Sequence, residues 1–371
     1  MMFEILSTGI VYRNPKPHLR SRQAMHPALV DLGDGEMFCS FDIGEAVESL
    51  DYRTYKSRSM DGGETWEFEG RLFEDPVERP ATHTMRTSLM ADGSMVGFGA
   101  RSYRDDPEEG LTNRETLGFV PVDLILSKSD DRGAAWSQPE VIDPPLVGPG
   151  FEICHSIIEL ASGRRLAPTS TWRGWNGELP NGEKALVLIS DDAGKTWHDY
   201  GVTFDGGEAG ILHWEQSVVS LGGDDLLAVA WAHDAKNGRN LPTPFSLSHD
   251  GGQTFSSPAA TGLRGQTCKA LHLGGGRILC VYRRDDVPGL WGNLSHLEGE
   301  RWVNDFELAL WGSSLSSSGM TGEADSTDEL SALKFGFPSL QRTSEDEVMF
   351  AFWCLEGWAC NIRWFRLRIG T

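Results

Sequence analysis

Short apolar runs alternate with turn residues along the whole chain. In each unit, an apolar run passes through a Gly or Asp turn into a second apolar run, as in 27–30, 34–35 and 37–39. The same unit starts again near residues 88, 157, 217, 270 and 338. Apolar runs of this length, bounded by turn residues, predict antiparallel hairpins. Six such hairpins along one chain indicate an internal structural repeat.

A second motif, Ser-x-Asp-x-Gly-x-Thr-Trp, follows most of these hairpins. It occurs at 59–66, with variants at 129–136, 190–197 and 248–255 and a degenerate copy at 295–302. Ser and Asp side chains accept hydrogen bonds from turn amides, and Gly adopts a backbone conformation with positive φ. We therefore interpret the motif as the support of a turn between two strands, and not as a row of carboxylate sites.

The two interleaved repeats predict an all-β protein, a six-bladed β-propeller with four-stranded antiparallel blades. The last alternating strand, at 360–369, leaves the sixth blade one strand short. We expect residues 5–12 to supply its outermost strand, so that the N-terminal strand closes the ring. Residues 1–371 then form a single domain.

Composition and charge narrow the range of partners. The 33 basic and 54 acidic residues give a net charge of -21, which disfavours nucleic acid and anionic membrane surfaces as partners. No apolar run reaches the length of about 18 residues that a spanning helix needs. Residues 1–20 lack a signal-peptide pattern, so a cytoplasmic protein is expected, with a secreted form whose signal was trimmed as the alternative. The sequence does not predict an oligomeric state.

No cofactor signature is found. The six cysteines lack paired CxxC spacing, and no Gly-rich phosphate loop joins a strand to a helix. We therefore expect neither a metal nor another cofactor.

We term the Ser-x-Asp-x-Gly-x-Thr-Trp motif the Asp box. With Asp boxes on a sixfold repeat, the sequence resembles the sialidase superfamily over nearly its full length. The segment 163–168 is similar to a strand of that family's third blade, and 214–221 is similar to the segment with its catalytic Glu, here Glu215. The resemblance implies a glycoside hydrolase.

Departures from the family pattern concern recognition of the substrate carboxylate. The family's opening Arg-Ile-Pro reads Met25, His26 and Pro27 here, and Ala230 and Trp231 stand where a second Arg is expected. No Tyr-Ser-x-Leu nucleophile segment is found near the C-terminus. These departures argue against sialic acid itself as the substrate.

Propeller topology predicts where a site lies. The loop before each innermost strand and the loop after the second strand share one face, which we term the mouth face; the Asp boxes lie on the opposite face. The resemblance and this placement give three catalytic candidates: Asp51 as general acid, Glu215 as second carboxylate and Tyr282 as nucleophile. The candidates for substrate binding are His26, Arg86, His155, Trp172, Arg173, Trp231, Arg283, Arg284 and Trp353. Trp faces stack on sugar rings and Arg binds carboxylates, so this set suits a carbohydrate, acidic sugars included.

Three functions fit the predicted site. The first is a glycoside hydrolase acting on a glycan or sugar. The second is a non-catalytic carbohydrate-binding propeller, and the third is a polysaccharide lyase with His26, His155 or His233 as the base. Hydrolysis produces a new reducing end, elimination produces an unsaturated sugar that absorbs ultraviolet light, and a binding protein produces neither.

Overall fold

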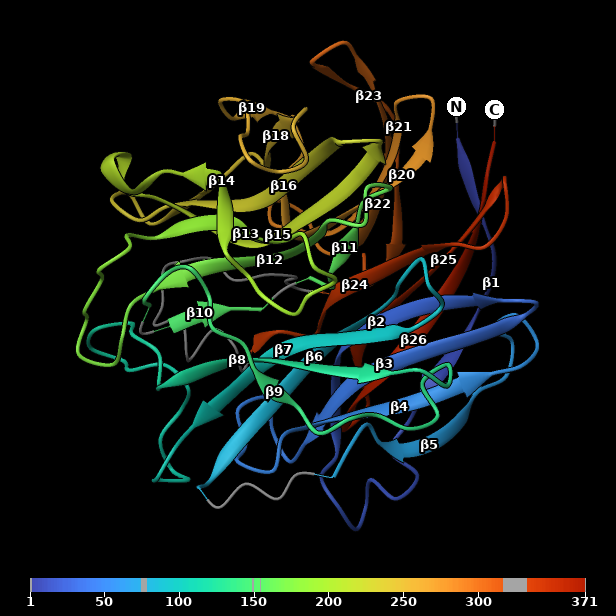
Figure 1. Cartoon of the computed structure of the whole chain (residues 1–371). Coiled ribbons are helices and arrows are strands. Elements are labelled where there is room, and N and C mark those ends of the chain that lie inside the picture. The colour runs from blue at the N-terminus through green and yellow to red at the C-terminus, as the bar shows by residue number, and fades with distance from the viewer. Residues whose placement is uncertain (1, 75–78, 149, 154, 316–331, 371) are drawn as a thin grey trace.

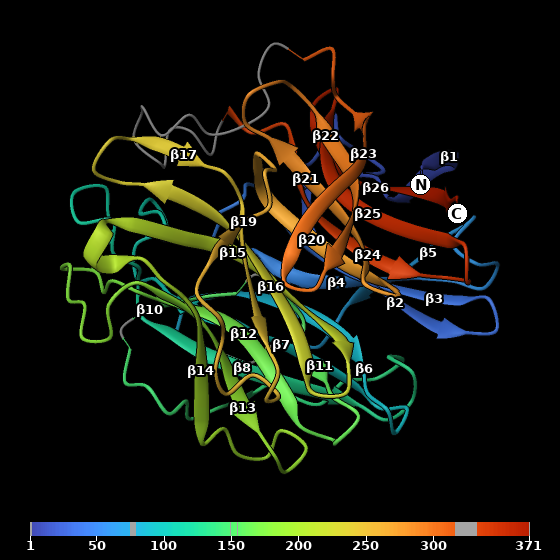
Figure 2. The same cartoon turned by 90° about the horizontal axis from the view of Figure 1, so that it is seen from above.

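The computed structural model describes residues 2–74, 79–148, 150–153, 155–315 and 332–370. Their strands form six antiparallel sheets arranged in a ring, seen from two directions in Figures 1 and 2. The strands β2, β6, β15, β20 and β24, whose bounds follow, are the innermost ones of five blades. Among them, β24 contacts both β2 and β20, β2 contacts β6, and β15 contacts β20. The six-bladed propeller predicted from the repeats is thereby confirmed.

Each of the six sheets is one blade. Blade one comprises β2 (Gln23–Gly33), β3 (Glu36–Gly44), β4 (Arg53–Ser59) and β5 (Glu67–Arg71). Blade two comprises β6 (Ala81–Leu89), β7 (Met95–Tyr103), β8 (Val122–Ser129) and β9 (Glu140–Val141). Blade three comprises β10 (Gly150–Glu152), β12 (Arg165–Trp172), β13 (Lys184–Ser190) and β14 (Asp199–Asp205), and β11 (Ile158–Glu159) also pairs with β12.

The second half of the ring follows the same plan. Blade four comprises β15 (Ile211–Gly222), β16 (Asp225–Asp234), β18 (Pro244–Ser248) and β19 (Ala259–Ala260), with β17 (Arg239–Leu241) also paired to β16. Blade five comprises β20 (Gly265–Gly274), β21 (Arg277–Arg284), β22 (Leu290–Glu298) and β23 (Arg301–Trp311). Blade six comprises β24 (Phe335–Arg342), β25 (Glu347–Glu356), β26 (Ala359–Ile369) and β1 (Phe3–Tyr12).

Helical structure is sparse. The described residues include the short 3-10 helix η1 (Gly207–Ala209). Within this described part, no helix has the length and apolar character that a membrane crossing requires.

The Asp boxes support turns, as interpreted from the sequence. In blade one, Asp61 Oδ1 accepts hydrogen bonds from Ser59 Oγ at 2.7 Å and from the Thr65 N–H at 2.9 Å. The Trp66 indole N–H donates to the Gly63 carbonyl at 2.8 Å. The boxes lie between the third and fourth strands of blades one to four, on the face opposite the mouth. These carboxylates are therefore occupied in turns, away from the mouth.

The N-terminal strand closes the ring. β1 pairs antiparallel with β26, from Phe3 opposite Ile369 to Tyr12 opposite Ile362. Phe3 is 3% exposed, and its ring meets Phe306 of blade five edge to face, with centroids 5.2 Å apart. The first residues of the chain thus join the last blade to its neighbour.

Replacing Phe3 tests this closure. Phe3→Ala should lower the free energy of unfolding by about 3–5 kcal/mol, because it removes a large buried side chain between two blades. Ile5→Ala on the same strand is the matched control, since Ile5 is 39% exposed, and it should cost far less. Urea unfolding of both variants measures the difference; equal losses would contradict the proposed role of Phe3.

Candidate functional site

Four innermost strands carry a bulge at equivalent positions near the mouth. The register shifts lie between residues 25 and 28 in β2, 214 and 217 in β15, 266 and 269 in β20, and 336 and 339 in β24. In each bulge one residue adopts a left-handed backbone: His26 at φ 53°, Glu215 at 50°, Thr267 at 50° and Phe337 at 51°. All four residues line the same pocket. A bulge turns a side chain away from its regular direction, and here it turns four of them into one space.

The left-handed backbone at these positions has an energetic cost. A non-Gly residue in this region costs on the order of 1–3 kcal/mol and persists only where the surrounding structure enforces it. Such strain is typical of active sites and ligand-binding sites. The shared conformation of four pocket residues therefore makes this space the candidate functional site.

The pocket has two compartments that share His26, Val47, Glu215 and Phe337. The smaller, of about 100 Å³, also includes Thr267, Trp231, Arg283, Leu333 and Trp353. The larger, of about 230 Å³, also includes Tyr52, Arg86, Glu48, His83 and Glu152. Both compartments combine apolar and aromatic walls with charged groups, as small-molecule sites do.

Glu215 presents a carboxyl group with a raised pKa. Burial raises the pKa of this carboxyl group, while Arg283, Lys269 and the Thr267 backbone amide partly oppose the effect. Its Oε2 atom is buried and has no hydrogen-bond partner among the described residues. A carboxyl group with a raised pKa keeps its proton to a higher pH than an exposed one, and in that form it can donate the proton to a bound ligand.

His26 and Tyr52 form a hydrogen-bonded pair in the pocket. The Nδ1 atom of His26 is hydrogen-bonded to the Tyr52 hydroxyl group at 2.7 Å. Burial, together with the positive charges of Arg86 and Lys269, holds the pKa of His26 well below its usual value. Burial also raises the pKa of Tyr52 well above its usual value. Near neutral pH the pair is thus a neutral imidazole and a neutral phenol, and the proton between them stays on the Tyr52 oxygen.

Asp42 lies close to His26 and binds Arg86. The carboxylate is fully buried and accepts hydrogen bonds from Thr54 Oγ1 and Thr84 Oγ1, each at 2.6 Å. Arg86 Nη1 donates to it at 2.8 Å, and His26 Nδ1 lies 3.8 Å from its Oδ2. Burial raises the pKa of Asp42, and Arg86 opposes that shift. Asp42 therefore holds Arg86 in place across the boundary between blades one and two.

Three buried cations surround the pocket. Arg86 and Lys269 both lie against the Phe337 ring, 4.8 Å and 4.6 Å from its centroid. Arg283 donates to Gln266 Oε1 at 3.0 Å and to the Phe335 carbonyl at 3.1 Å. Burial lowers the pKa of Arg283, and Glu215 opposes that shift. These cations lie among carboxyl groups, with Arg86 paired to Asp42 and Arg283 close to Glu215, so the pocket carries charges of both signs.

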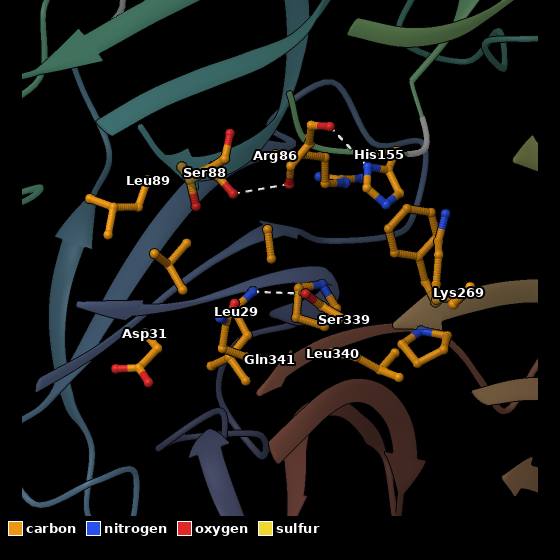
Figure 3. Close-up of a pocket in the computed structure, with 18 residues that line it drawn as sticks. Leu29, Asp31, Arg86, Ser88, Leu89, His155, Lys269, Ser339, Leu340 and Gln341 are labelled. Atoms are coloured by element: carbon orange, nitrogen blue, oxygen red, sulfur yellow. Dashed lines mark hydrogen bonds between the residues drawn. The ribbon is translucent and has the colours of Figure 1, made fainter. Parts of the chain in front are cut away.

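A further cavity of about 350 Å³ lies between the innermost strands (Figure 3). Arg86, His155 and Lys269 line it together with Ser339 of β24. Burial and Lys269 lower the pKa of His155 to about 4. Phe337 lines this cavity and both pocket compartments, so its ring lies where the three spaces meet.

The structure brings several predicted residues together. His26, Glu215, Arg283, Trp231 and Trp353 line the smaller compartment, and Arg86 lines the larger one. His155 lies in the cavity between the innermost strands.

Other predicted residues lie elsewhere. Asp51 is exposed, and its Oδ1 accepts hydrogen bonds from the Glu45 N–H at 3.0 Å and from Ser49 Oγ at 2.6 Å. Trp172 donates to the Leu117 carbonyl at 2.6 Å, and Arg173 pairs with Glu183. None of these side chains is among the residues that line the two pocket compartments.

The side chains of residues 282–284 in β21 point alternately toward the pocket and away from it. Tyr282 is buried in the core between blades four and five, where its hydroxyl group donates to Glu307. Arg283 faces the pocket. Arg284 points away from it and pairs with Asp286 and Glu307. Tyr282 and Arg284 therefore do not line the compartment that contains Glu215.

Sequence reasoning missed Tyr52, Thr267 and Phe337. Tyr52 lies in the loop between β3 and β4, which no motif marked. Thr267 and Phe337 occupy the same bulge position as His26 and Glu215. Aligning the hairpins on the turns that follow their first strands would have placed His26, Glu215 and Thr267 in one column, because each lies seven residues before a glycine, Gly33, Gly222 or Gly274.

Comparisons with known proteins agree with this architecture. Residues 118–345 match the BNR repeat-like domain, and the chain belongs to this family. A crystal structure of a protein of unknown function from Dyadobacter fermentans has a TM-score of 0.73 at 19% identity, covering 99% of both chains. Among curated proteins, none matches the sequence.

Solved sialidases share the same fold. The NanB sialidase of Streptococcus pneumoniae has a TM-score of 0.66 at 12% identity, covering 97% of this chain and 70% of its own. The Trypanosoma rangeli sialidase in complex with sialic acid has a TM-score of 0.62 at 13% identity, covering 94% of this chain and 54% of its own. The chain is thus a β-propeller of the BNR repeat-like family, and its fold is similar to that of these sialidases.

Replacing Asp42 tests its supporting role. Asp42→Ala should lower the free energy of unfolding by about 3–5 kcal/mol, because Arg86 would remain buried without its carboxylate. Asp51→Ala, which removes an exposed carboxylate, is the control and should change the unfolding midpoint little. Chemical denaturation compares the two variants. A stable Asp42→Ala variant would show that Arg86 does not depend on this ion pair.

Proposed function

We propose that this protein is a glycoside hydrolase that removes a terminal acidic sugar from a glycan. The buried, unpartnered carboxyl group of Glu215, facing a small pocket beside His26 and Arg283, carries this proposal. The two adjoining compartments, of about 100 Å³ and 230 Å³, together leave room for one sugar, and Trp231 and Trp353 offer aromatic surface to its apolar face. The cations Arg86, Lys269 and Arg283 favour a sugar that bears a carboxylate.

In the proposed reaction, Glu215 donates its proton to the glycosidic oxygen as the bond to the anomeric carbon breaks. The hydroxyl oxygen of Tyr52 attacks that carbon, and its proton passes to Nδ1 of His26 in the same step, because formation of the bond makes this proton strongly acidic. Water then attacks the anomeric carbon and the bond to the Tyr52 oxygen breaks; the Glu215 carboxylate takes a proton from this water, and His26 returns its proton to Tyr52. A Tyr nucleophile has precedent in sialidases. Asp51, the acid expected from the sequence, remains an alternative to Glu215 in this role.

A polysaccharide lyase is the second candidate. The 2.7 Å hydrogen bond between His26 and Tyr52 favours it, because a neutral imidazole base and a phenol acid suit proton abstraction beside a uronate carboxylate. Such a reaction would not need the carboxyl group of Glu215. The two candidates therefore differ in their products and in their dependence on Glu215.

Product analysis of variants separates these functions. Glu215→Gln should reduce glycoside hydrolysis by about 10²-fold or more, because the general acid is lost. Tyr52→Phe should also lose turnover, whereas Asp51→Ala should keep most of it. The assay measures new reducing ends and ultraviolet absorbance over a panel of fluorogenic glycosides and uronate polysaccharides. Unsaturated products that persist in Glu215→Gln would identify a lyase, and loss of hydrolysis in Asp51→Ala would return the acid role to Asp51.

The pH dependence of kcat/KM gives an independent test. Activity should fall as the pH rises through the raised pKa of Glu215, because this residue acts protonated. It should also fall as the pH drops through the lowered pKa of His26, because the imidazole acts neutral. The profile is therefore expected to be bell-shaped.

Two adjacent arginines provide matched variants for this profile. Arg283→Gln removes a charge that lowers the pKa of Glu215, so the alkaline limb should move to higher pH. Arg284→Gln should leave that limb in place, because Arg284 pairs with Asp286 and Glu307 outside the pocket. An unchanged limb in Arg283→Gln would mean that another group controls it.

A further inference from the structure

Thr267 carries two unfavourable features at the wall of the pocket. Its φ of 50° places a β-branched side chain in the left-handed region, where such residues are genuine outliers. The residue is 2% exposed, and its hydroxyl oxygen Oγ1 has no hydrogen-bond partner among the described residues. Asn at this position would tolerate the backbone conformation better, and Val would remove the unpartnered hydroxyl group. The fold alone gives no reason for Thr here.

The hydroxyl group of Thr267 shares its compartment with a second unpartnered oxygen. Oε2 of Glu215 also lacks a partner among the described residues, and both side chains line the smaller compartment. The backbone amide of Thr267 interacts with the Glu215 carboxyl group, so the two bulges on β15 and β20 support each other. Buried polar groups without partners are uncommon unless water or a ligand satisfies them.

The chemistry of the two groups matches a sugar. A protonated carboxyl group donates one hydrogen bond, and a Thr hydroxyl group both donates and accepts. The glycosidic oxygen needs the first group, and a neighbouring ring hydroxyl needs the second. Arg283 in the same compartment supplies donors for a carboxylate, while Trp231 supplies an apolar face.

We propose that Thr267 is a specificity-determining residue whose Oγ1 hydrogen-bonds a ring hydroxyl of the sugar bound beside Glu215. This inference rests on the proposed function for the class of ligand. The bulge turns residue 267 out of the regular strand direction, and Thr267 lines the compartment beside Glu215.

Two conservative variants test the role of Thr267. Thr267→Val keeps the branched shape and loses the hydroxyl group, whereas Thr267→Ser keeps the hydroxyl group. The probes are D-glucuronate, D-galacturonate and N-acetylneuraminate, with binding followed by tryptophan fluorescence, and fluorogenic glycosides of the same three sugars. Thr267→Val should weaken binding of the preferred sugar and its kcat/KM about tenfold, and Thr267→Ser should stay within about threefold of the wild type.

Two further readouts exclude a merely structural role. The melting temperature of Thr267→Val should not fall below that of the wild type, because the lost hydroxyl group has no partner in the protein. Deoxy analogues of the preferred sugar should include one that binds the wild type about tenfold more weakly but binds Thr267→Val as well as the parent sugar does.

The outcomes separate this inference from the proposed function. Sugar binding without turnover, weakened in Thr267→Val, would support Thr267 and contradict the hydrolase. Turnover by the wild type with equal kcat/KM in Thr267→Val would contradict the inference and leave the hydrolase standing. A Thr267→Val variant that melts earlier but binds sugar normally would overturn the inference, as would the absence of binding of every probe to the wild type.

Discussion

The site depends on a backbone constraint, the interruption of the innermost strands just where they reach the mouth. In an uninterrupted strand, side chains alternate between the two neighbouring blades, and both directions end in packed cores. The bulges in β2, β15, β20 and β24 break this alternation and turn one residue of each strand toward the axis. Four blades thereby contribute to a single pocket while their sheets remain intact.

The protonation states of the pocket residues depend on burial as much as on ion pairs. Asp42 holds Arg86 against the Phe337 ring, and Lys269 lies against the same ring. Burial, together with these cations, keeps His26 neutral, and burial also keeps the Glu215 carboxyl group protonated to a higher pH than an exposed one. A proton donor, a proton acceptor and cationic side chains thus coexist in one small space. Under the proposed function, these cations would bind the carboxylate of an acidic sugar although the protein as a whole is acidic.

The fold was predictable from the sequence because its signals are local and repeated. Turn residues and apolar runs define each hairpin, and the strand missing from blade six predicted the pairing of β1 with β26. The site was only partly predictable. In β21 both faces of the strand are buried, so the apolar pattern could not tell whether Tyr282 or Arg283 faces the mouth. A bulge leaves no trace in hydrophobic periodicity, which is why Thr267 and Phe337 were missed although His26 and Glu215 were found.

The most direct test of the account is a crystal structure of the Glu215→Gln variant with a glycoside that the wild type hydrolyses. The account predicts one sugar ring in the pocket between His26, Thr267 and Phe337, with its glycosidic oxygen within hydrogen-bond distance of residue 215. A sugar bound on the Asp-box face, or bound at the mouth with residue 215 remote from the glycosidic oxygen, would contradict it.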